Sequence, residues 1–362
     1  MTHSVALYSY GQCGLDMNHV DKNVIKTYSI AEIDSFIADP IEIKIVAIEI
    51  NYNDPELTDI ELEQLKNCDL VMVKSIELNA EIIKLIMKHD KSNFIFIVNG
   101  LLNNWPANAK VECEPHWITT TANIYQRSLE NLANANLFPF KEKLWMFDVL
   151  YGLARQHRIF GKAILQDYKN NKWFYESPFF TKDLTGAFNN LNFDIPDLWE
   201  DGIEIDQDEA YKCKYHGHNN LMISQIVPFK IYNKTAYSLV FETQFDNGFS
   251  LFTEKIAKPM LAYRLFIVVS GQYYLQNLRK LGFKTFDGII DESYDLEPNN
   301  QSRWSMALEQ AVILCQRPQQ EVLSQIAPIV FHNYQVLKNL NSNKVNDCVQ
   351  TFLIQQGLNR KK

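Results

Sequence analysis

The chain has 362 residues, more than the roughly 250 to 300 at which a single hydrophobic core stops growing, so two domains are expected. With 46% hydrophobic and 22% charged residues, the composition is that of a globular protein and excludes a disordered or collagen-like chain. The formal net charge of −8 lacks the overall basic footprint of a nucleic-acid-binding protein, although it is compatible with a local basic groove.

The N-terminal sequence MTHSVALYSYGQCG has no basic region followed by a long apolar run, so we expect no signal peptide. The longest apolar runs, at residues 95–98 and 265–269, are far too short to cross a bilayer. The 6 cysteines show no pairing rhythm, which is typical of reduced thiols. We therefore expect a cytoplasmic protein without a membrane span.

The first hundred residues alternate short apolar strands with amphipathic helices. Strands are predicted at residues 5–10, 43–50, 70–73 and 94–98, and helices at residues 30–37, 57–65 and 78–88. Apolar runs of this length between helices are typical of a parallel sheet covered by helices. The pattern predicts an α/β fold, with an N-terminal domain at residues 1–143.

A second domain is predicted at residues 144–318. Its core is a βαβ run with strands at residues 238–242, 265–269 and 283–286 and helices at residues 253–262 and 273–281, the last ending at Gly282. From Asn300 onward the chain is predicted to be helical, with breaks at Pro318 and Pro328. We expect the helical tail, residues 319–362, to cross back to the N-terminal domain; packing between subunits is the alternative.

The strongest candidate for chemistry is a predicted strand, polar loop and helix at residues 240–271. The helix begins with Thr253, Glu254 and Lys255. Ligands of open α/β sheets collect beyond the carboxyl ends of strands, where helix N–H groups favour phosphate. Lys255 would attract a diphosphate, and Glu254 would accept hydrogen bonds from ribose hydroxyls. The same residues also fit an ordinary cap, in which Thr253 caps the helix, Glu254 favours its dipole and Lys255 is solvated.

Longer stretches carry a family resemblance. They are VPFKIYNKTAYSLVFET, LFTEKIAKPMLAYRLFIVVSG and YLQNLRKLGFKTFDGIIDESYD, with Arg303 beyond them. This part of the chain, from Ile226 to about Arg303, resembles the C-terminal domain of fucosyltransferase-like GT-B glycosyltransferases of the bacterial and phage type. FDVLYGLARQHRIF, at residues 147–160, looks like the family's entry to its nucleotide domain. The resemblance is absent from the first 140 residues.

The resemblance implies the GT-B architecture, in which two Rossmann-like domains face a cleft. It also implies a donor site made of Arg158, Glu242, Thr253, Glu254 and Lys255, with Arg158 on the diphosphate and Glu242 orienting the sugar. Arg155 and His157 lie nearby in the sequence. The segment Phe241-Glu242-Thr243 lacks the Asn that many fucosyltransferases carry, so GDP-fucose is not implied as the donor.

The implied reaction is an inverting, metal-independent sugar transfer from a nucleotide-sugar, which is a co-substrate, so no cofactor is expected. Fixed cations and helix N–H groups would stabilise the departing nucleoside diphosphate. A carboxylate of the facing domain would deprotonate the acceptor hydroxyl. Asp16, after the first strand, and Glu49, at the end of the second, are the predicted catalytic carboxylates, because both should lie at strand ends facing the cleft. An ordinary turn or surface role is the alternative for both, and His19, Glu114 and His116 are weaker candidates.

Three other polar segments resemble functional motifs but also fit an ordinary structural role. The D-x-D sequence at residues 206–208 has the form of a metal-binding motif but lies in an acidic stretch expected to be exposed. Cys213, His216 and His218 have no fourth ligand at a zinc-site spacing. We therefore predict no metal site. The segment DESYD at residues 291–295 reads equally as a cleft loop or as acids that cap the helix starting near Ser302.

The sequence leaves more than one possible acceptor for the transferred sugar. A bacterial oligosaccharide is the first expectation. A hydroxymethylated base in phage DNA is the alternative, and the acidic net charge argues mildly against it. A third reading is a catalytically silent relative that binds a nucleotide-sugar as a sensor or scaffold.

Overall fold

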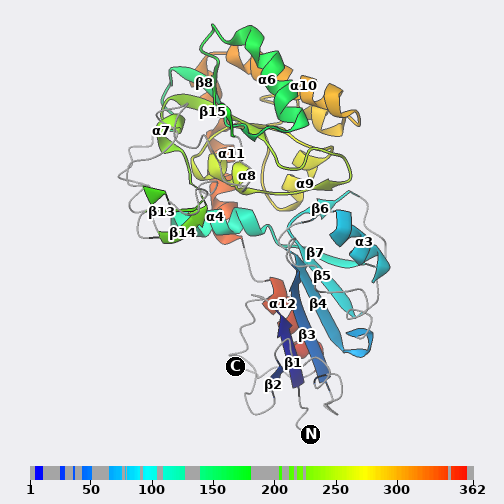
Figure 1. The fold of residues 1–362 in the computed structure, drawn as a ribbon. Coiled ribbons are helices and arrows are strands. Elements are labelled where there is room, and N and C mark those ends of the chain that lie inside the picture. The colour runs from blue at the N-terminus through cyan, green and yellow to red at the C-terminus, as the bar shows by residue number, and fades with distance from the viewer. Residues whose placement is uncertain are drawn as a thin grey trace. The chain divides into compact units, whose positions relative to one another are not determined.

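The structure is a computed structural model in which two compact units can be described, residues 1–116 with 341–362 and residues 117–340. Figure 1 shows the elements of both units. The described residues are 5–10, 25–28, 36, 43–50, 65–75, 78, 80–89, 93–103, 109–126, 139–180, 204–205, 212–215, 218–222, 226–340 and 344–356.

The first unit contains a parallel sheet whose spatial order is β2-β1-β3-β4-β5-β7. The strands are β1 (Val5–Tyr10), β2 (Ile25–Tyr28), β3 (Ile43–Ile50), β4 (Leu70–Ser75), β5 (Phe94–Val98) and β7 (Lys110–Cys113). This is the doubly wound order in which the connections change direction between the first and third strands. The switch point of this sheet therefore lies between β1 and β3.

One face of this sheet is covered by α12 (Lys344–Gln355). Val345, Val349 and Leu353 of this helix are spaced four residues apart and form a single stripe. They pack against buried residues of β3, β4 and β5, among them Ile45 and Met72. The last helix of the chain thus completes the core of the first unit, which also contains α3 (Ala80–Lys88), η3 (Leu65–Asn67) and β6 (Leu101–Leu102).

The second unit contains a smaller parallel sheet in the order β10-β8-β15-β17. Its strands are β8 (Trp145–Val149), β10 (Phe174–Glu176), β15 (Thr235–Phe241) and β17 (Phe266–Val269). Every residue of β15 is buried, as expected for a central parallel strand. The connections change direction between β8 and β15, so the switch point of this sheet lies there.

Helices and shorter elements complete the second unit. The helices are α4 (His116–Gln126), α6 (Gln156–Leu165), α7 (Phe229–Tyr232), α8 (Glu254–Leu261), α9 (Tyr274–Lys280), α10 (Asn300–Cys315) and α11 (Gln319–Asn339). The shorter elements are β9 (Gly152–Leu153), η5 (Gln166–Tyr168), β11 (Phe179–Phe180), β12 (Glu204–Ile205), β13 (Lys212–Tyr215), β14 (His218–Met222), β16 (Phe249–Ser250) and η7 (Glu292–Leu296).

The unit boundaries differ from the predicted divisions after residues 143 and 318. Phe140 packs against Phe331 of α11, with ring centroids 5.5 Å apart. Lys143 N donates to Gln319 Oε1 at 2.7 Å, and Gln319 Nε2 donates to Lys143 O at 2.9 Å. Both the segment before residue 144 and helix α11 therefore belong to the second unit.

Two predicted features of the second unit are wrong. Residues 283–286 form no strand, because side chains take their backbone groups: Asn333 pairs with the N–H and C=O of Lys284, and Glu292 accepts from Phe286 N at 2.6 Å. Pro328 does not break α11, which continues through it. The predicted strands at residues 5–10, 43–50 and 94–98 are confirmed at those bounds.

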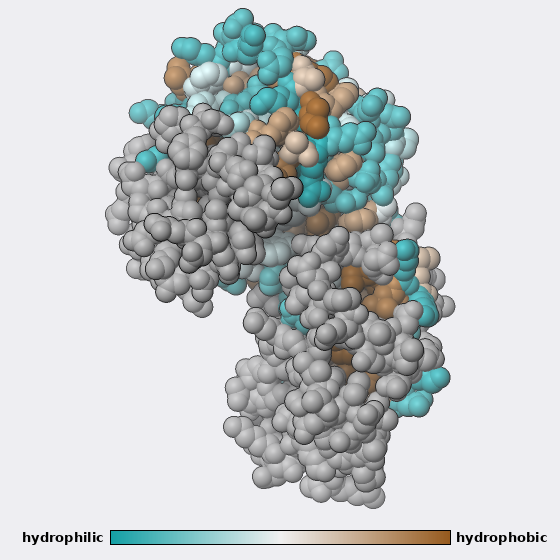
Figure 2. Space-filling view, viewed as in Figure 1, coloured by the Kyte–Doolittle hydropathy of each residue, from teal (hydrophilic) through white to brown (hydrophobic). Residues whose placement is uncertain are grey.

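No helix among the described residues is both long and apolar enough to cross a membrane. The described surface seen in Figure 2 mixes hydrophilic and hydrophobic residues. The predicted helices at residues 30–37 and 57–65 fall almost entirely outside the described part of the chain.

Candidate functional site

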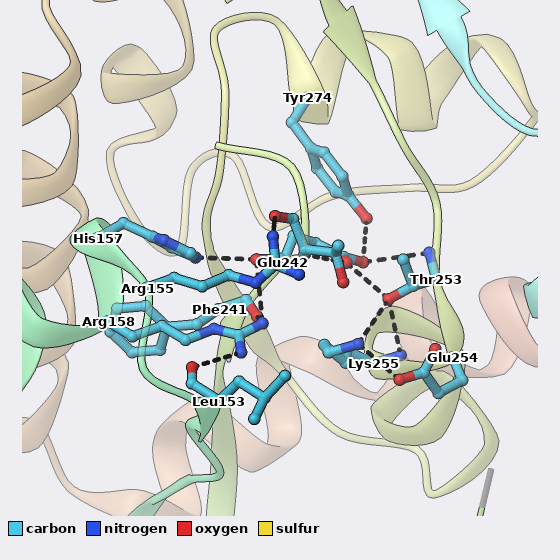
Figure 3. A network of polar contacts seen from close by, with 11 residues as sticks. Leu153, Arg155, His157, Arg158, Phe241, Glu242, Thr253, Glu254, Lys255 and Tyr274 are labelled. Atoms are coloured by element: carbon cyan, nitrogen blue, oxygen red, sulfur yellow. Dashed lines mark hydrogen bonds and ion pairs between the residues drawn. The ribbon is translucent and has the colours of Figure 1, made fainter. Parts of the chain in front are cut away.

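The five predicted donor-site residues lie together in one polar network at the carboxyl ends of β8 and β15 (Figure 3). Glu242 follows directly after β15, and Arg158 comes from the first turn of α6. The other three residues form the start of α8. The network therefore lies at the switch point of the second sheet, where ligands of open α/β sheets bind.

The Glu242 carboxylate is the centre of this network and is fully buried. It accepts four hydrogen bonds: from Thr243 N at 3.0 Å, Thr253 N at 3.3 Å, Thr253 Oγ1 at 2.6 Å and Tyr274 Oη at 2.9 Å. Burial raises the pKa of Glu242, whereas the charge of Lys255 opposes the rise. Because all four hydrogen bonds are donated to the carboxylate, they fit its ionised form and occupy its acceptor positions. Glu242 therefore holds the start of α8 against β15.

The capping interpretation of Thr253 is confirmed. Its side chain accepts from Lys255 N at 3.3 Å, as an N-cap does. Lys255 is more than a solvated cap residue, because its Nζ lies 2.6 Å from Glu254 Oε1. The Lys255 side chain is 27% exposed. The first turn of α8 thus presents a partly exposed ammonium group, while the N–H groups of Lys255 and Ile256 are bonded to Thr253.

Two lysines share the start of α8 with the Glu254 carboxylate. Burial works to raise the pKa of Glu254, but Lys255 and Lys258 together lower it, so this carboxylate is ionised. Burial lowers the pKa of Lys258 to about 8, with Glu254 opposing the shift. Lys255 and Lys258 are three residues apart and therefore share one side of α8, where the helix dipole is also positive.

Arg158 is buried, and its guanidinium group binds backbone carbonyls. It donates to Leu153 O at 2.9 Å, Phe241 O at 3.2 Å and Glu242 O at 3.3 Å. Gly152 makes room for this group: a Cβ there would lie 3.3 Å from Arg158 Nη1. Among the described residues, Arg158 Nε has no hydrogen-bond partner. Arg158 therefore links the end of β9 to the end of β15.

His157 binds the same strand end. Its Nε2 lies 2.8 Å from Glu242 O, and because a carbonyl oxygen only accepts, Nε2 carries the proton. Burial and the charge of Arg158 lower the pKa of His157 to about 3, so the ring is neutral near pH 7. The ring stacks on Phe245 at a centroid distance of 4.5 Å. This histidine is a packed structural group.

Arg155 is the accessible cation on the α6 side. It stands at the N-cap of α6, is half-buried, and donates from Nη1 to Thr243 O at 3.2 Å. Arg155 reaches Thr243 directly, and Lys255, from a different helix start, reaches Glu242 through the Thr253 hydroxyl (Figure 3). The resemblance named Arg158 for the diphosphate, but exposure distinguishes the two arginines: Arg155 is half-buried and Arg158 is buried.

The acids of residues 291–295 are structural. Asp295 accepts from Leu275 N at 2.8 Å and Gln276 N at 2.9 Å, which caps α9. Asp291 accepts from Ser293 N within its own turn. The helix that begins near Ser302 is capped instead by Asn299, so the expected capping partner was wrong.

The remaining predicted residues lie elsewhere. Glu49 is buried on β3, one residue before its end, in the first unit. Asp16, His19 and the D-x-D at residues 206–208 lie outside the described residues, as do the side chains of the Cys213 segment. The described residues contain no group of three or more side chains placed to hold a metal ion. No protein-family model matches the sequence, and no curated protein matches it significantly.

Proposed function

We propose that the protein is a glycosyltransferase that moves a sugar from a nucleotide-sugar to an acceptor hydroxyl. The observation that supports this most is that two cations from different helix starts reach the carboxyl end of β15: Arg155 donates to Thr243 O, and Lys255 Nζ donates to the Thr253 hydroxyl that is itself bonded to Glu242. Cations at helix starts beside a sheet switch point suit the diphosphate of such a donor.

In this proposal Lys255 and Arg155 contact the diphosphate, and Glu254 accepts hydrogen bonds from the ribose. Arg158 and Glu242 act as positioning residues, since both are buried and already bonded within the protein. A sugar contact by Glu242 would require one of its four hydrogen bonds to be exchanged. Fixed positive charge stabilises the leaving nucleoside diphosphate without a metal.

The transfer is proposed to invert the sugar. The acceptor oxygen forms a bond to the anomeric carbon while the bond from that carbon to the diphosphate breaks. The acceptor proton passes to a carboxylate of the first unit, Glu49 or Asp16. The proposal includes a GT-B arrangement of two Rossmann-like domains, a cytoplasmic location and a bacterial oligosaccharide as acceptor. Both parallel sheets have a switch point, which supports the two-domain reading.

A thermal-shift screen tests donor binding. The probes are UDP-, GDP-, CMP- and dTDP-sugars, and a ligand at about a hundred times its dissociation constant stabilises by roughly 2.7 kcal/mol. We expect one of them to raise the melting temperature of the wild type and not of Lys255→Ala. The exposed Lys169→Ala is the matched control and should respond like the wild type. If no nucleotide-sugar shifts the wild type, the proposal fails.

A second assay separates an enzyme from a catalytically silent nucleotide-sugar-binding relative. Slow release of nucleoside diphosphate from the donor that binds indicates an enzyme, because water replaces the acceptor. Binding without any release, with or without candidate acceptors, indicates the silent relative.

A further inference from the structure

The carboxyl edge of the sheet in the first unit carries four polar side chains on adjacent strands, three of them buried and one, a lysine, 12% exposed. They are Glu49 of β3, Lys74 of β4, Asn99 directly after β5 and Glu114 directly after β7, and we call them the polar row. Each comes from a different strand, and each lies near the end where ligands of parallel sheets bind.

The strand register places the polar row on one face. Glu49 is paired with Lys74, and Lys74 with Ile97, which lies two residues before Asn99. Ile97 is in turn paired with Glu112, two residues before Glu114. Paired residues of a parallel sheet share a face, and side chains alternate with a period of two. The hydrogen bond from Glu114 N to Val98 O, at 2.9 Å, continues the ladder past the strand ends.

Helix α12 covers the apolar part of the same face and stops at the polar row. Ile45, Met72 and Ile97 belong to the cluster that packs against α12. Lys344 N, at the first residue of α12, donates to Glu114 Oε2 at 3.0 Å. The polar row therefore lies next to the first residue of α12, beyond the apolar residues that this helix covers.

Two members of the polar row are bonded to each other and two are not. Lys74 Nζ lies 2.7 Å from Glu114 Oε1. Asn99 is 1% exposed, and neither atom of its amide has a hydrogen-bond partner. Glu49 is 9% exposed, and within the described part of the chain no hydrogen bond or ion pair reaches its carboxylate. A buried polar group without a partner is destabilising, so such groups in a native protein mark sites with another role.

We propose that the polar row binds hydroxyl groups of a neutral carbohydrate. An amide both donates and accepts, which matches a pair of sugar hydroxyls. Two carboxylates and one ammonium give the polar row a formal charge of −1, which disfavours the phosphates of DNA. This inference deepens the proposed function, on which it rests: the polar row holds the acceptor, and Glu49 takes its hydroxyl proton.

The first test needs no knowledge of the sugar. In Asn99→Leu the unpaired amide is replaced by an apolar side chain of similar size, so the ligand-free protein should melt at least about 2 °C higher than the wild type. Such gains in stability at the expense of function are common at binding sites. If Asn99 is instead part of the folding core as a hydrogen-bonded group, the variant melts lower, and that result overturns the proposal.

The second test measures sugar binding by saturation-transfer NMR with maltose, lactose and chitobiose as probes. We expect transfer from the wild-type protein to at least one probe and its loss in Asn99→Leu. The matched control is Glu112→Gln. The Glu112 side chain lies on the same face of the sheet but is 52% exposed, so this variant should bind the sugar as the wild type does. Absence of transfer to all three probes, or transfer that persists in Asn99→Leu, contradicts the proposal.

The two proposals fail in different ways. Lys255 belongs to the second unit, so Lys255→Ala should bind the sugar probes as the wild type does. Asn99 belongs to the first unit, so Asn99→Leu should still be stabilised by the nucleotide-sugar. Sugar binding without any nucleotide-sugar shift removes the proposed function and leaves the polar row as a carbohydrate site. A nucleotide-sugar shift without sugar binding removes the carbohydrate site at the polar row and leaves the proposed function. Salt-dependent binding of duplex DNA that Asn99→Leu abolishes contradicts the carbohydrate assignment.

Discussion

Thr253 donates to both oxygens of the Glu242 carboxylate, from its backbone N to Oε1 at 3.3 Å and from its hydroxyl to Oε2 at 2.6 Å. Glu242 follows directly after strand β15, and Thr253, eleven positions further along the chain, is the N-cap of α8. The pair fixes where α8 begins relative to β15, and with it the position of Lys255.

Glu242→Gln should destabilise the protein and weaken donor binding together. The amide group replaces an acceptor oxygen by a donor, which then faces backbone and hydroxyl donors in a buried site. Leaving such groups unpaired costs about 1 to 3 kcal/mol each. Chemical denaturation gives the stability, and Glu309→Gln on the exposed side of α10 is the control. A variant as stable as the wild type would show that the four hydrogen bonds contribute nothing.

Arg155→Ala should mainly weaken donor binding, whereas Arg158→Ala should mainly lower stability. Arg155 is half-buried with one backbone contact, so its loss should weaken donor binding at least tenfold and change stability little. Arg158 is buried and satisfies three carbonyls, so its loss should cost about 2 to 4 kcal/mol of unfolding free energy. Titration calorimetry and denaturation measure the two quantities. If Arg155→Ala binds donor normally, the diphosphate contact is misassigned.

The Lys74–Glu114 ion pair in the first unit makes a third prediction. Lys74→Met leaves the Glu114 carboxylate buried beside a thioether, and breaking a buried pair in this way costs about 3 to 5 kcal/mol. The double variant Lys74→Met/Glu114→Gln removes the charge that was left unpaired and should recover part of the loss. Denaturation curves of the three proteins check this. An equal loss in the single and double variants would mean that the ion pair is not the cause.

How far the fold follows from the sequence depends on where each strand lies in its sheet. The central strands at 43–50 and 94–98 contain apolar runs, at 45–48 and 94–98, that are almost entirely buried, which made them predictable. The edge strands β2 and β7 were missed because IKTY and KVEC have no such run. Residues 283–286 look like a strand because two phenylalanines are buried there, although the backbone bonds to side chains instead.

The candidate site was predictable only in part. A loop followed by Thr253, Glu254 and Lys255 is visible in the sequence as a helix start. The sequence does not show that Arg155 is accessible while Arg158 is buried, because both lie in the same short segment and burial depends on the carbonyls of another strand. Asn99 is followed by Gly100, and Asn-Gly is a common turn sequence, so the sequence gives no sign of a site there; its unpaired amide is a property of the folded chain.

His157 makes stability depend on pH. Its pKa in the folded protein is lowered to about 3, whereas the unfolded chain has the ordinary value near 6.5. Between these values the unfolded state binds a proton that the folded state does not, so stability is complete above pH 6.5 and falls as the pH decreases toward 3. The loss approaches about 1.4 kcal/mol for each pH unit.

His157→Gln keeps a donor for Glu242 O and does not titrate, so its melting temperature should fall less steeply than that of the wild type between pH 6.5 and pH 4. His116, whose pKa burial lowers to about 4, is present in both proteins and cancels in the comparison. Parallel curves would mean that His157 takes up its proton in the folded state at its ordinary pKa, and hence that the ring is not held neutral between Arg158 and the strand end.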